Sequence, residues 1–289
     1  MTSPGDPSLD PGERLGPYEI EARIGGGGRD GLVYRARYSG LDERHALRVL
    51  PAPMRGKAAL RFVEETELLC RLPRHLGLIN VRTAGLDEDR GLVYLGTDLC
   101  DGEPLARRLR HGSLGEREAV RITQQAARAV GFLQRHHVHH LDVQPGSVMV
   151  GPSDEVRLRE PAKVRESMRG EPVFDTSDAP RSFTFAWLAP EVIRGQLAAC
   201  TERTDVYGLG TLLYAALTGV WPGFGTMQDQ PFRLFEMILM RGPPAPRELV
   251  PEIDPALERI CLRALAIDPD ERHARPAELH EQLALWVPR

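Results

Sequence analysis

Residues 139–150 read HHLDVQPGSVMV, and this stretch decides the fold. A run with helical periodicity ends just before it, and the β-branched run at residues 148–150 closes it. Asp142 lies in the loop between these two elements. The sequence contains no internal repeat and no sign of a second domain, so we expect one folded domain built to hold this loop.

Length and composition restrict the class of protein. The chain has 289 residues, of which 42% are hydrophobic and 27% charged, which is ordinary for a globular protein with ample core. The net charge of −4 gives no reason to expect a nucleic-acid partner. No apolar run approaches the roughly 18 residues that cross a bilayer, and residues 1–6 lack the pattern of a signal peptide. We therefore expect a cytoplasmic protein with no membrane segment, whose widely spaced cysteines are buried reduced thiols (Cys70, Cys100, Cys200 and Cys261).

The N-terminal part of the chain predicts a glycine-rich β-hairpin. Residues 1–16 are rich in Pro, Gly, Ser and charge and are predicted to be a disordered tail. Residues 18–24 and 32–37 each read as a strand, with GGGGRDG at 25–31 between them. Glycine lets backbone N–H groups approach a phosphate closely, although a floppy turn is the alternative. A dinucleotide-binding fold is disfavoured, because a helix should follow its glycines.

Two further strands and one helix are predicted to accompany this hairpin. Residues 45–51 read as a third strand with Arg48 in it, and an ordinary exposed strand arginine is the alternative. Residues 57–72 follow a helical pattern that carries several acids, among them Glu65. Residues 91–98 read as another strand, and a simple buried strand before an Asp-Gly turn would explain this segment equally well.

The second half of the chain is predicted to be mainly helical. Residues 113–116 (SLGE) read as a capping box, which starts a helix that runs to about residue 136. Four histidines at 136, 137, 139 and 140 suggest a metal cluster at first sight. Residues 204–219 predict a buried helix closed by a glycine, and amphipathic helices follow at 256–266 and 277–286.

Taken together, these segments resemble the bacterial Ser/Thr protein kinases. Residues 139–150 resemble the catalytic loop of that family, H-R-D-L-K-P-x-N followed by an apolar strand, and Asp142 stands where the family keeps its base. Residues 187–191 resemble the A-P-E end of the activation segment, and the match keeps its order from residue 17 to 286. The glycines resemble the G-x-G-x-x-G-x-V loop (Gly26, Gly28 and Gly31, with Val33).

The resemblance implies an α+β, two-lobed protein kinase-like fold. A small antiparallel sheet with one helix is expected over residues 17–98, a hinge over 99–102, and a mainly helical lobe over 103–289. Glu65 would pair with Arg48, Glu191 would pair with Arg272, and Asp205 would brace the catalytic loop. His140 matches a histidine that packs in the core of the family, which argues against a metal cluster. These structural positions are all retained (Glu65, His140, Glu191, Asp205 and Arg272).

The resemblance also implies where a nucleotide would bind. Thr97 would stand beside the adenine pocket, and the residues after it would supply hinge backbone groups. Apolar residues that would enclose adenine are retained as well. The full set of implied nucleotide positions combines these with the glycines above (Val33, Ala46, Arg48, Thr97, Asp98, Cys100 and Met149).

The positions that neutralise phosphate charge depart from the family pattern together. Arg48 and Gln144 replace lysines, Ser147 replaces the metal-binding Asn, and Glu160 replaces the Asp of D-F-G. Phosphoryl transfer depends on positioning and electrostatics, and one such contact is worth on the order of a few kcal/mol in the barrier. The resemblance therefore implies a pseudokinase, with little or no phosphoryl transfer. Four further departures accompany these (an inserted Gly25, Leu141 for Arg, Pro161 for Phe and Ala162 for Gly).

Three hypotheses follow from this split between retained and altered positions. The favoured one is a signalling or scaffold protein that binds another protein, with no cofactor. The second is a weak or atypical ATP-dependent kinase or transferase, in which Asp142 and Glu160 hold one metal ion. The third is a sensor that binds ATP or ADP without Mg²⁺. Residues 163–188 resemble an activation segment and carry candidate phosphosites (Thr176, Ser177, Ser182 and Thr184).

Overall fold

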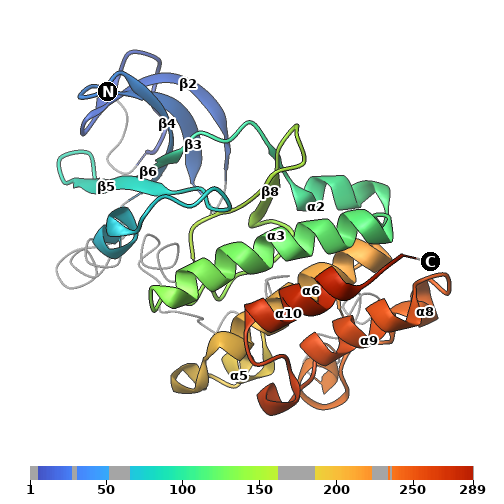
Figure 1. The fold of residues 1–289 in the computed structure, drawn as a ribbon. Helices are drawn as coiled ribbons and strands as arrows, with labels where there is room; N and C mark the ends of the chain where they lie inside the picture. Colours follow the sequence, from blue (N-terminus) through green and yellow to red (C-terminus); the bar gives the residue numbers. More distant parts are fainter. Residues whose placement is uncertain are drawn as a thin grey trace. The chain divides into compact units, whose positions relative to one another are not determined.

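The computed structural model describes residues 6–27, 31–51, 66–161, 186–222, 234 and 236–288. These residues form two compact units (Figure 1). The first holds the described residues up to 74 together with 79–101, and the second holds 75–78, 102–161 and the described residues from 186 onward. The first unit is built on a sheet and the second mainly on helices, which confirms the expected α+β class. In the described part of the chain, no helix has the length and apolar character needed to cross a membrane.

One antiparallel sheet organises the first unit, with its strands in the order β1-β2-β3-β4-β6-β5. Alternate side chains enter the core, as Tyr18 and Ile20 do in β2 and Leu47 and Val49 do in β4. Residues 66–71 are helical. The strands are β1 (Arg14–Leu15), β2 (Tyr18–Gly26), β3 (Leu32–Tyr38), β4 (Glu43–Pro51), β5 (Val81–Asp87) and β6 (Leu92–Asp98).

The residues just before β2 belong to this core, so the prediction of a disordered tail is wrong from residue 6 to residue 16. Leu9 and Leu15 are buried in the same cluster as β2 and β3. The Leu9 backbone N–H donates to the Tyr34 hydroxyl at 2.9 Å, and that hydroxyl donates to the Pro7 carbonyl at 2.9 Å. Two buried leucines and one buried tyrosine hold a segment whose average composition is that of a loop.

Residues 75–78 pack with the second unit, although they fall within the predicted small lobe. The backbone N–H of Leu158 donates to the Gly77 carbonyl at 2.8 Å. The ring of His75 stacks on Phe132, with the ring centroids 4.5 Å apart. These four residues therefore belong to the second unit, although no feature of the sequence marks where the chain enters and leaves it.

Helices surround a central buried helix in the second unit. Helix α6 is buried from Thr204 to Thr218, and α3, α9 and α10 pack against it (Figure 1). A small three-stranded sheet in the order β7-β8-β9 carries the end of the 139–150 stretch. The main elements are β7 (Glu103–Pro104), α2 (Leu105–Arg108), α3 (Glu116–Arg135), β8 (Val148–Val150), β9 (Val156–Leu158), α5 (Pro190–Ile193), α6 (Glu202–Thr218), α8 (Pro246–Leu249), α9 (Pro255–Ala264) and α10 (Pro276–Leu285). Short turns of other helix types are η2 (Leu109–His111), η5 (Leu197–Ala199), η6 (Met237–Arg241) and η7 (Pro269–Glu271).

The helix ends confirm one sequence prediction and contradict another. Gly219 closes α6 with a φ of 75°, the left-handed conformation that glycine adopts readily. The capping box predicted at 113–116 does not form, because α3 begins after Gly115 and has no side-chain cap. Glu116 instead accepts a hydrogen bond from the backbone N–H of Asp254 at 2.6 Å, so its carboxylate serves a distant segment.

All four cysteines are free thiols, and none forms a disulfide. Cys261 is buried, and Cys100 and Cys200 are half-buried. Cys70 is exposed, so the prediction of buried thiols is wrong there. Thr66 and Leu69 occupy the inward face of the helical segment 66–71, which leaves Cys70 on the outward face.

Two glycines of the second unit should respond oppositely to alanine substitution. A Cβ on Gly131 would meet only the Arg135 guanidinium at 3.8 Å, whereas a Cβ on Gly219 would lie 2.7 Å from the Ser113 backbone nitrogen. We expect Gly131→Ala to raise the free energy of unfolding by about 0.5–1 kcal/mol, because glycine is entropically costly inside a helix. We expect Gly219→Ala to lower it by about 1–2 kcal/mol, because alanine is strained at positive φ. Urea unfolding of the two variants beside the wild type measures both changes, and equal signs would contradict the account.

Candidate functional site

The carboxylate of Asp205 holds the 139–150 loop in place. Asp205 lies in the first turn of α6 and is 1% exposed. One of its oxygens accepts from the Leu141 backbone N–H at 2.7 Å. The other accepts from the His140 backbone N–H and from the Gln134 side chain, each at 3.0 Å. One charged group thus ties the loop to both α3 and α6.

These bonds hold a strained residue. Leu141 has a φ of 56°, in the left-handed region that a leucine rarely adopts. Such a conformation costs roughly 1–3 kcal/mol and persists only where its surroundings impose it. Here the Asp205 carboxylate bonds Leu141 and its neighbour His140 directly. The loop geometry is therefore imposed from α6.

His140 links the loop to the segment after β9. Its side chain is 0% exposed, and its Nε2 lies 3.1 Å from the Arg159 carbonyl oxygen. Since a carbonyl oxygen only accepts, Nε2 carries the proton, and Nδ1 accepts from the Asp142 backbone N–H at 3.3 Å. Both ring nitrogens are thus used within the fold. Among the described residues, no group of His, Cys, Asp and Glu is arranged to hold a metal ion.

Within the loop, the side chains at the base and phosphate-neutralising positions bind one another. The Gln144 amide Nε2 donates to the Asp142 carboxylate at 2.6 Å. The Ser147 hydroxyl donates to the Asp142 carbonyl oxygen at 2.6 Å and accepts from the Gln144 backbone N–H at 3.1 Å. Asp142 and Ser147 are both buried, at 4% and 3% exposure. The Ser147 hydroxyl pins the backbone of the loop.

The carboxylate at the position of the D-F-G aspartate lies beside a cation. Glu160 is 4% exposed, and its Oε1 lies 3.3 Å from the Arg159 guanidinium. Pro161, which follows, is also buried. Arg159 was not among the predicted site residues, because the sequence does not show that its side chain turns toward Glu160.

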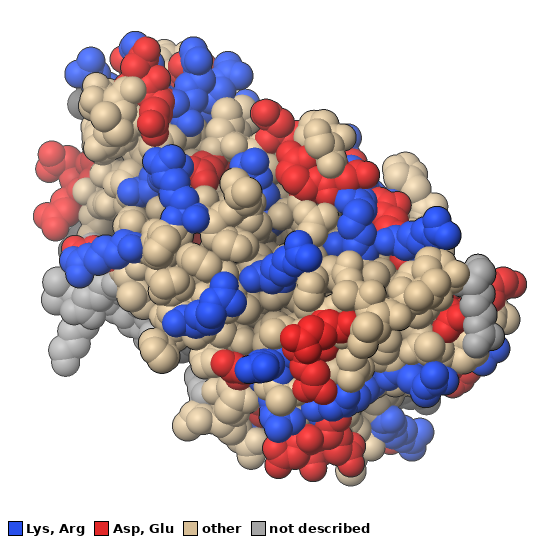
Figure 2. Space-filling model, in the orientation of Figure 1, with Lys and Arg blue, Asp and Glu red and all other residues tan. Residues whose placement is uncertain are grey.

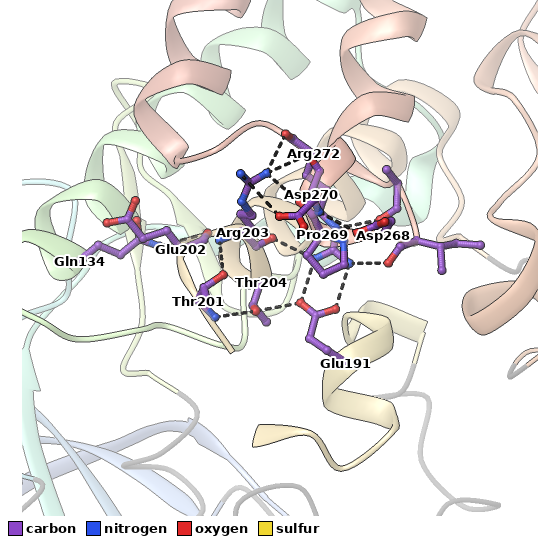
Figure 3. Close-up of polar contacts among 12 residues, drawn as sticks. Gln134, Glu191, Thr201, Glu202, Arg203, Thr204, Asp268, Pro269, Asp270 and Arg272 are labelled. Atoms are coloured by element: carbon purple, nitrogen blue, oxygen red, sulfur yellow. Dashed lines mark hydrogen bonds and ion pairs between the residues drawn. The ribbon is translucent and has the colours of Figure 1, made fainter. Parts of the chain in front are cut away.

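A buried ion pair fixes the far side of α6 (Figure 3). The Arg272 guanidinium binds both oxygens of Glu191, at 2.8 and 2.9 Å, and both side chains are almost fully buried. Its other N–H groups donate to three carbonyl oxygens, those of Arg203, Ala266 and Ile267. All five guanidinium donors therefore have partners, which a buried cation requires.

Glu191 has its own additional partner, and the balance lowers its pKa. The Thr204 hydroxyl donates to Glu191 Oε1 at 2.8 Å. Burial by itself raises the pKa of Glu191, but the hydrogen bonds and charge of Arg272 outweigh burial and hold the pKa below its ordinary value. The pair therefore contributes stability above the pKa that Glu191 has in the unfolded chain, and this contribution is lost as pH falls through the lower folded pKa.

In the first unit, cross-strand pairing gathers four of the proposed nucleotide positions on one face of the sheet. Val33 pairs with Arg48, and Ala46 pairs with Thr97. Ala46 and Arg48 are two residues apart on β4, so all four side chains point to the same side. The Thr97 hydroxyl lies 3.4 Å from the Ala46 carbonyl oxygen, a long hydrogen bond across the pair.

The glycine hairpin absorbs an extra residue in β2. Pairing passes from Arg23 opposite Tyr34 to Gly25 opposite Val33, which leaves Ile24 as a β-bulge. Gly26 and Gly31 both have positive φ, and the Gly27 backbone N–H donates to the Gly31 carbonyl at 2.7 Å. The strand can thus carry the additional residue that we inferred at Gly25.

The remaining predicted positions are dispersed. Asp98 uses its carboxylate within the first unit, on the side chains of Asn80 and Arg82. Met149 is half-buried in β8 of the second unit, and Cys100 is half-buried after β6. Several predicted positions lie outside the described residues (Gly28, Glu65, Ala162, Thr176, Ser177, Ser182 and Thr184). Sequence reasoning missed Gln134, whose one signal is a polar residue within the buried face of α3.

Comparison with known proteins shows to which family the chain is related. The model of the protein kinase domain family matches residues 18–283. The chain is 32% identical over 278 residues to Serine/threonine-protein kinase pkn3 of Myxococcus xanthus, covering 89% of this chain and 47% of that protein. It is 30% identical over 273 residues to Serine/threonine-protein kinase PknB of Mycolicibacterium smegmatis, covering 92% of this chain and 42% of that protein. The chain thus spans less than half the length of these relatives.

Removing the charge of Glu191 should strongly destabilise the protein. We expect Glu191→Gln to lower the free energy of unfolding by about 3–5 kcal/mol, because it leaves the buried Arg272 cation uncompensated. The matched control is Glu236→Gln, which breaks an exposed pair with Arg241 and should change the free energy by about 0.5 kcal/mol or less. Urea unfolding at neutral pH measures both changes.

The same variants test the direction of the pH dependence. Wild-type stability should fall on acidification below about pH 4.3, where the unfolded Glu191 takes up a proton. Glu191→Gln should lack this part of the decline, and Glu236→Gln should keep it. A decline that is identical in all three proteins would show that the ion pair is not its source.

Proposed function

We propose that this chain, which belongs to the protein kinase family, acts as a pseudokinase: a signalling or scaffold protein that binds another protein and transfers little or no phosphate. Its fold is that of a protein kinase, with an antiparallel sheet in one unit and a mainly helical second unit. The proposal concerns its chemistry, which family membership leaves open.

The contacts within residues 142–147 carry the proposal. The family uses a lysine at the position of Gln144 and a metal-binding Asn at the position of Ser147. Here the Gln144 amide is bonded to the Asp142 carboxylate, and the Ser147 hydroxyl is bonded to the backbone. Both side chains stabilise the loop itself, and neither brings a positive charge to neutralise a phosphate.

The residues present do not fit Mg²⁺ bound to ATP. Mg²⁺ takes oxygen ligands in near-ideal octahedral geometry. At the two metal positions, Ser147 offers one buried hydroxyl engaged with the backbone, and Glu160 offers a buried carboxylate 3.3 Å from the Arg159 guanidinium. The positive charge of Arg159 opposes a second cation at the same carboxylate. We therefore derive no catalytic step through the metal.

The expected loss of reaction rate depends on how many of the phosphate-neutralising positions are altered. Loss of one preorganised electrostatic contact slows an enzyme by about 10²–10³. Arg48, Gln144, Ser147 and Glu160 all differ from the residues that supply those contacts in the family. Arginine in place of the lysine keeps the charge but not the shape, because its guanidinium is planar and forked. Asp142 as a base cannot compensate, since a base contributes only about 10²–10⁴.

The parts that maintain the fold support a binding role. The Glu191–Arg272 pair and the Asp205 network are complete, so the second unit keeps a rigid surface without requiring a nucleotide. A scaffold needs such a surface and no turnover. Another protein is therefore the proposed partner.

A thermal-shift titration with ATP and ADP tests the proposal, each with Mg²⁺, with Mn²⁺ or with EDTA. A ligand at about 100 times its Kd stabilises the folded protein by about 2.7 kcal/mol, which raises Tm by several degrees. We expect no shift that requires a metal, and no transfer of label from γ-³²P-ATP to the chain or to a generic acceptor protein. The matched control is the variant Arg48→Lys/Gln144→Lys/Ser147→Asn/Glu160→Asp, which restores the family residues and should gain a metal-dependent shift.

Two results would contradict the proposal in different ways. A metal-dependent shift with label transfer that Asp142→Asn abolishes would make the chain an active kinase. A shift of equal size in EDTA would favour the nucleotide sensor, to which the retained face of Val33, Ala46 and Thr97 would contribute. Failure of the restored variant to bind metal and nucleotide would show that other positions also prevent binding.

A further inference from the structure

A pocket lies on the surface of the second unit and is lined by residues of α3 and α10 together with His75, none of which belongs to the 139–150 loop. It encloses about 280 Å³, and its floor is made of Ala127, Gly131 and Ala277. The two helices pack along each other, so the hollow lies on a rigid support (Figure 1). A Cβ on Gly131 would meet only the Arg135 guanidinium at 3.8 Å. The hollow exists because small residues occupy positions where larger side chains would fit.

Two arginines flank this floor. Arg128 and Arg135 are seven positions apart on α3, which places them on one helix face about 10 Å apart along the axis. Among the residues that the structure describes, no carboxylate forms an ion pair with either, and this includes the exposed Glu281 of α10. Figure 2 shows separate basic side chains on largely uncharged surface over α3 and acidic side chains over α10. The positive charge of the two arginines is thus available to a ligand.

Both guanidinium groups are positioned by aromatic or imidazole neighbours. The Arg128 Nε–H donates to His280 Nε2 at 3.3 Å, and His280 Nδ1 lies 3.2 Å from the Gln124 carbonyl oxygen. Because Nε2 accepts and Nδ1 donates, this imidazole is neutral. The Arg135 guanidinium lies 5.9 Å from the centroid of the Phe132 ring. Uncharged neighbours therefore partly preorganise both arginines, and no carboxylate is needed to hold them.

An imidazole forms the remaining wall of the pocket. His75 lines the pocket and stacks on Phe132. Burial, and after it the positive charge of Arg135, lowers the pKa of His75. Leu76, the next residue, is 91% exposed. An exposed apolar residue thus follows, in the chain, a residue that lines the pocket.

We propose that this pocket binds an acidic segment of a partner protein, through two carboxylates and an apolar side chain between them. One small anion would not use both arginines, because they are separated by about 10 Å along α3. In an extended polyproline II segment, residues i and i+3 lie on one side about 9 Å apart, which matches this spacing. Each arginine would bind one carboxylate through its forked guanidinium. The partner motif is Glu-x-x-Glu or its Asp equivalents, with an apolar residue inside it.

The inference depends on the proposed function only for the existence of a protein partner. It does not depend on the loss of phosphoryl transfer, and its test contains no nucleotide. Peptide binding by a catalytically active chain would remove the pseudokinase proposal and leave the pocket. Absence of peptide binding by an inactive chain would remove the pocket proposal and leave the pseudokinase proposal.

Fluorescence anisotropy with a defined peptide tests the pocket. The probe is fluorescein-Gly-Glu-Leu-Pro-Glu-Gly-amide, and the control peptide carries Gln in place of both Glu residues. We expect Arg128→Gln/Arg135→Gln to weaken binding of the probe about fivefold or more, because two ion pairs are lost. The matched control, Arg110→Gln/Arg117→Gln, removes two exposed arginines from η2 and the start of α3 with the same change in charge and should leave the Kd unchanged.

A second variant fills the pocket without changing its net charge. Gly131→Leu fills the floor, displaces the neighbouring Arg135 guanidinium and keeps both positive charges, and we expect it to weaken binding as much as the double arginine variant. In spectra of histidine-labelled wild-type protein, the probe should shift the ring signals of His75 and His280 but not that of the exposed His111. Equal weakening by the control arginine pair, equal binding of the Gln peptide, or no binding by the wild type would each overturn the proposal.

Discussion

Three N–H groups converge on the carboxylate of Asp205, and the shape of the 139–150 loop follows from them. They come from the end of α3 and from two consecutive residues of the loop, so one buried charge joins three segments. The left-handed backbone of Leu141 is tolerated because two of these bonds impose it. His140 then ties the same loop to the segment after β9, which sets where Glu160 lies. Asp142 and Glu160 are thus both connected to this single anchor.

Two further charged contacts of the second unit differ in their geometry. Arg272 has a partner for each of its five donors, and Glu191 has a second donor in Thr204. Such a network adds rigidity because each buried polar group is paired. Glu160 and Arg159 form a looser contact of 3.3 Å between neighbours in the chain. The first contact joins α5 to the segment after η7, whereas the second lies at the position that resembles the D-F-G aspartate.

Sequence patterns predicted the elements that have a strong period or a specific motif. Strands β2, β3, β4 and β6 and helix α6 were found close to their observed bounds, because alternation or continuous burial marks them. Strand β5 was missed, since it lies at the sheet edge and only its first residue is buried. The tail and the capping box were misread because Leu9 and Glu116 act through distant partners, Tyr34 and Asp254. Motif matching identified Asp142, Gln144 and Ser147 as the residues to inspect, but the bonds among them depend on side-chain rotamers that no motif encodes.

The Ser147 hydroxyl contributes to the fold of the loop by itself. Its bond to the Asp142 carbonyl oxygen and the bond it accepts from Gln144 hold the turn that leads into β8. A side chain smaller than the family's asparagine thus makes two of the hydrogen bonds that hold the loop. Selection for folding and selection for phosphoryl transfer therefore act on separable properties of the same position. Substitutions at Gln144, Ser147 and Glu160 therefore affect the folding free energy as well as any chemistry, because all three side chains have bonding partners within the fold.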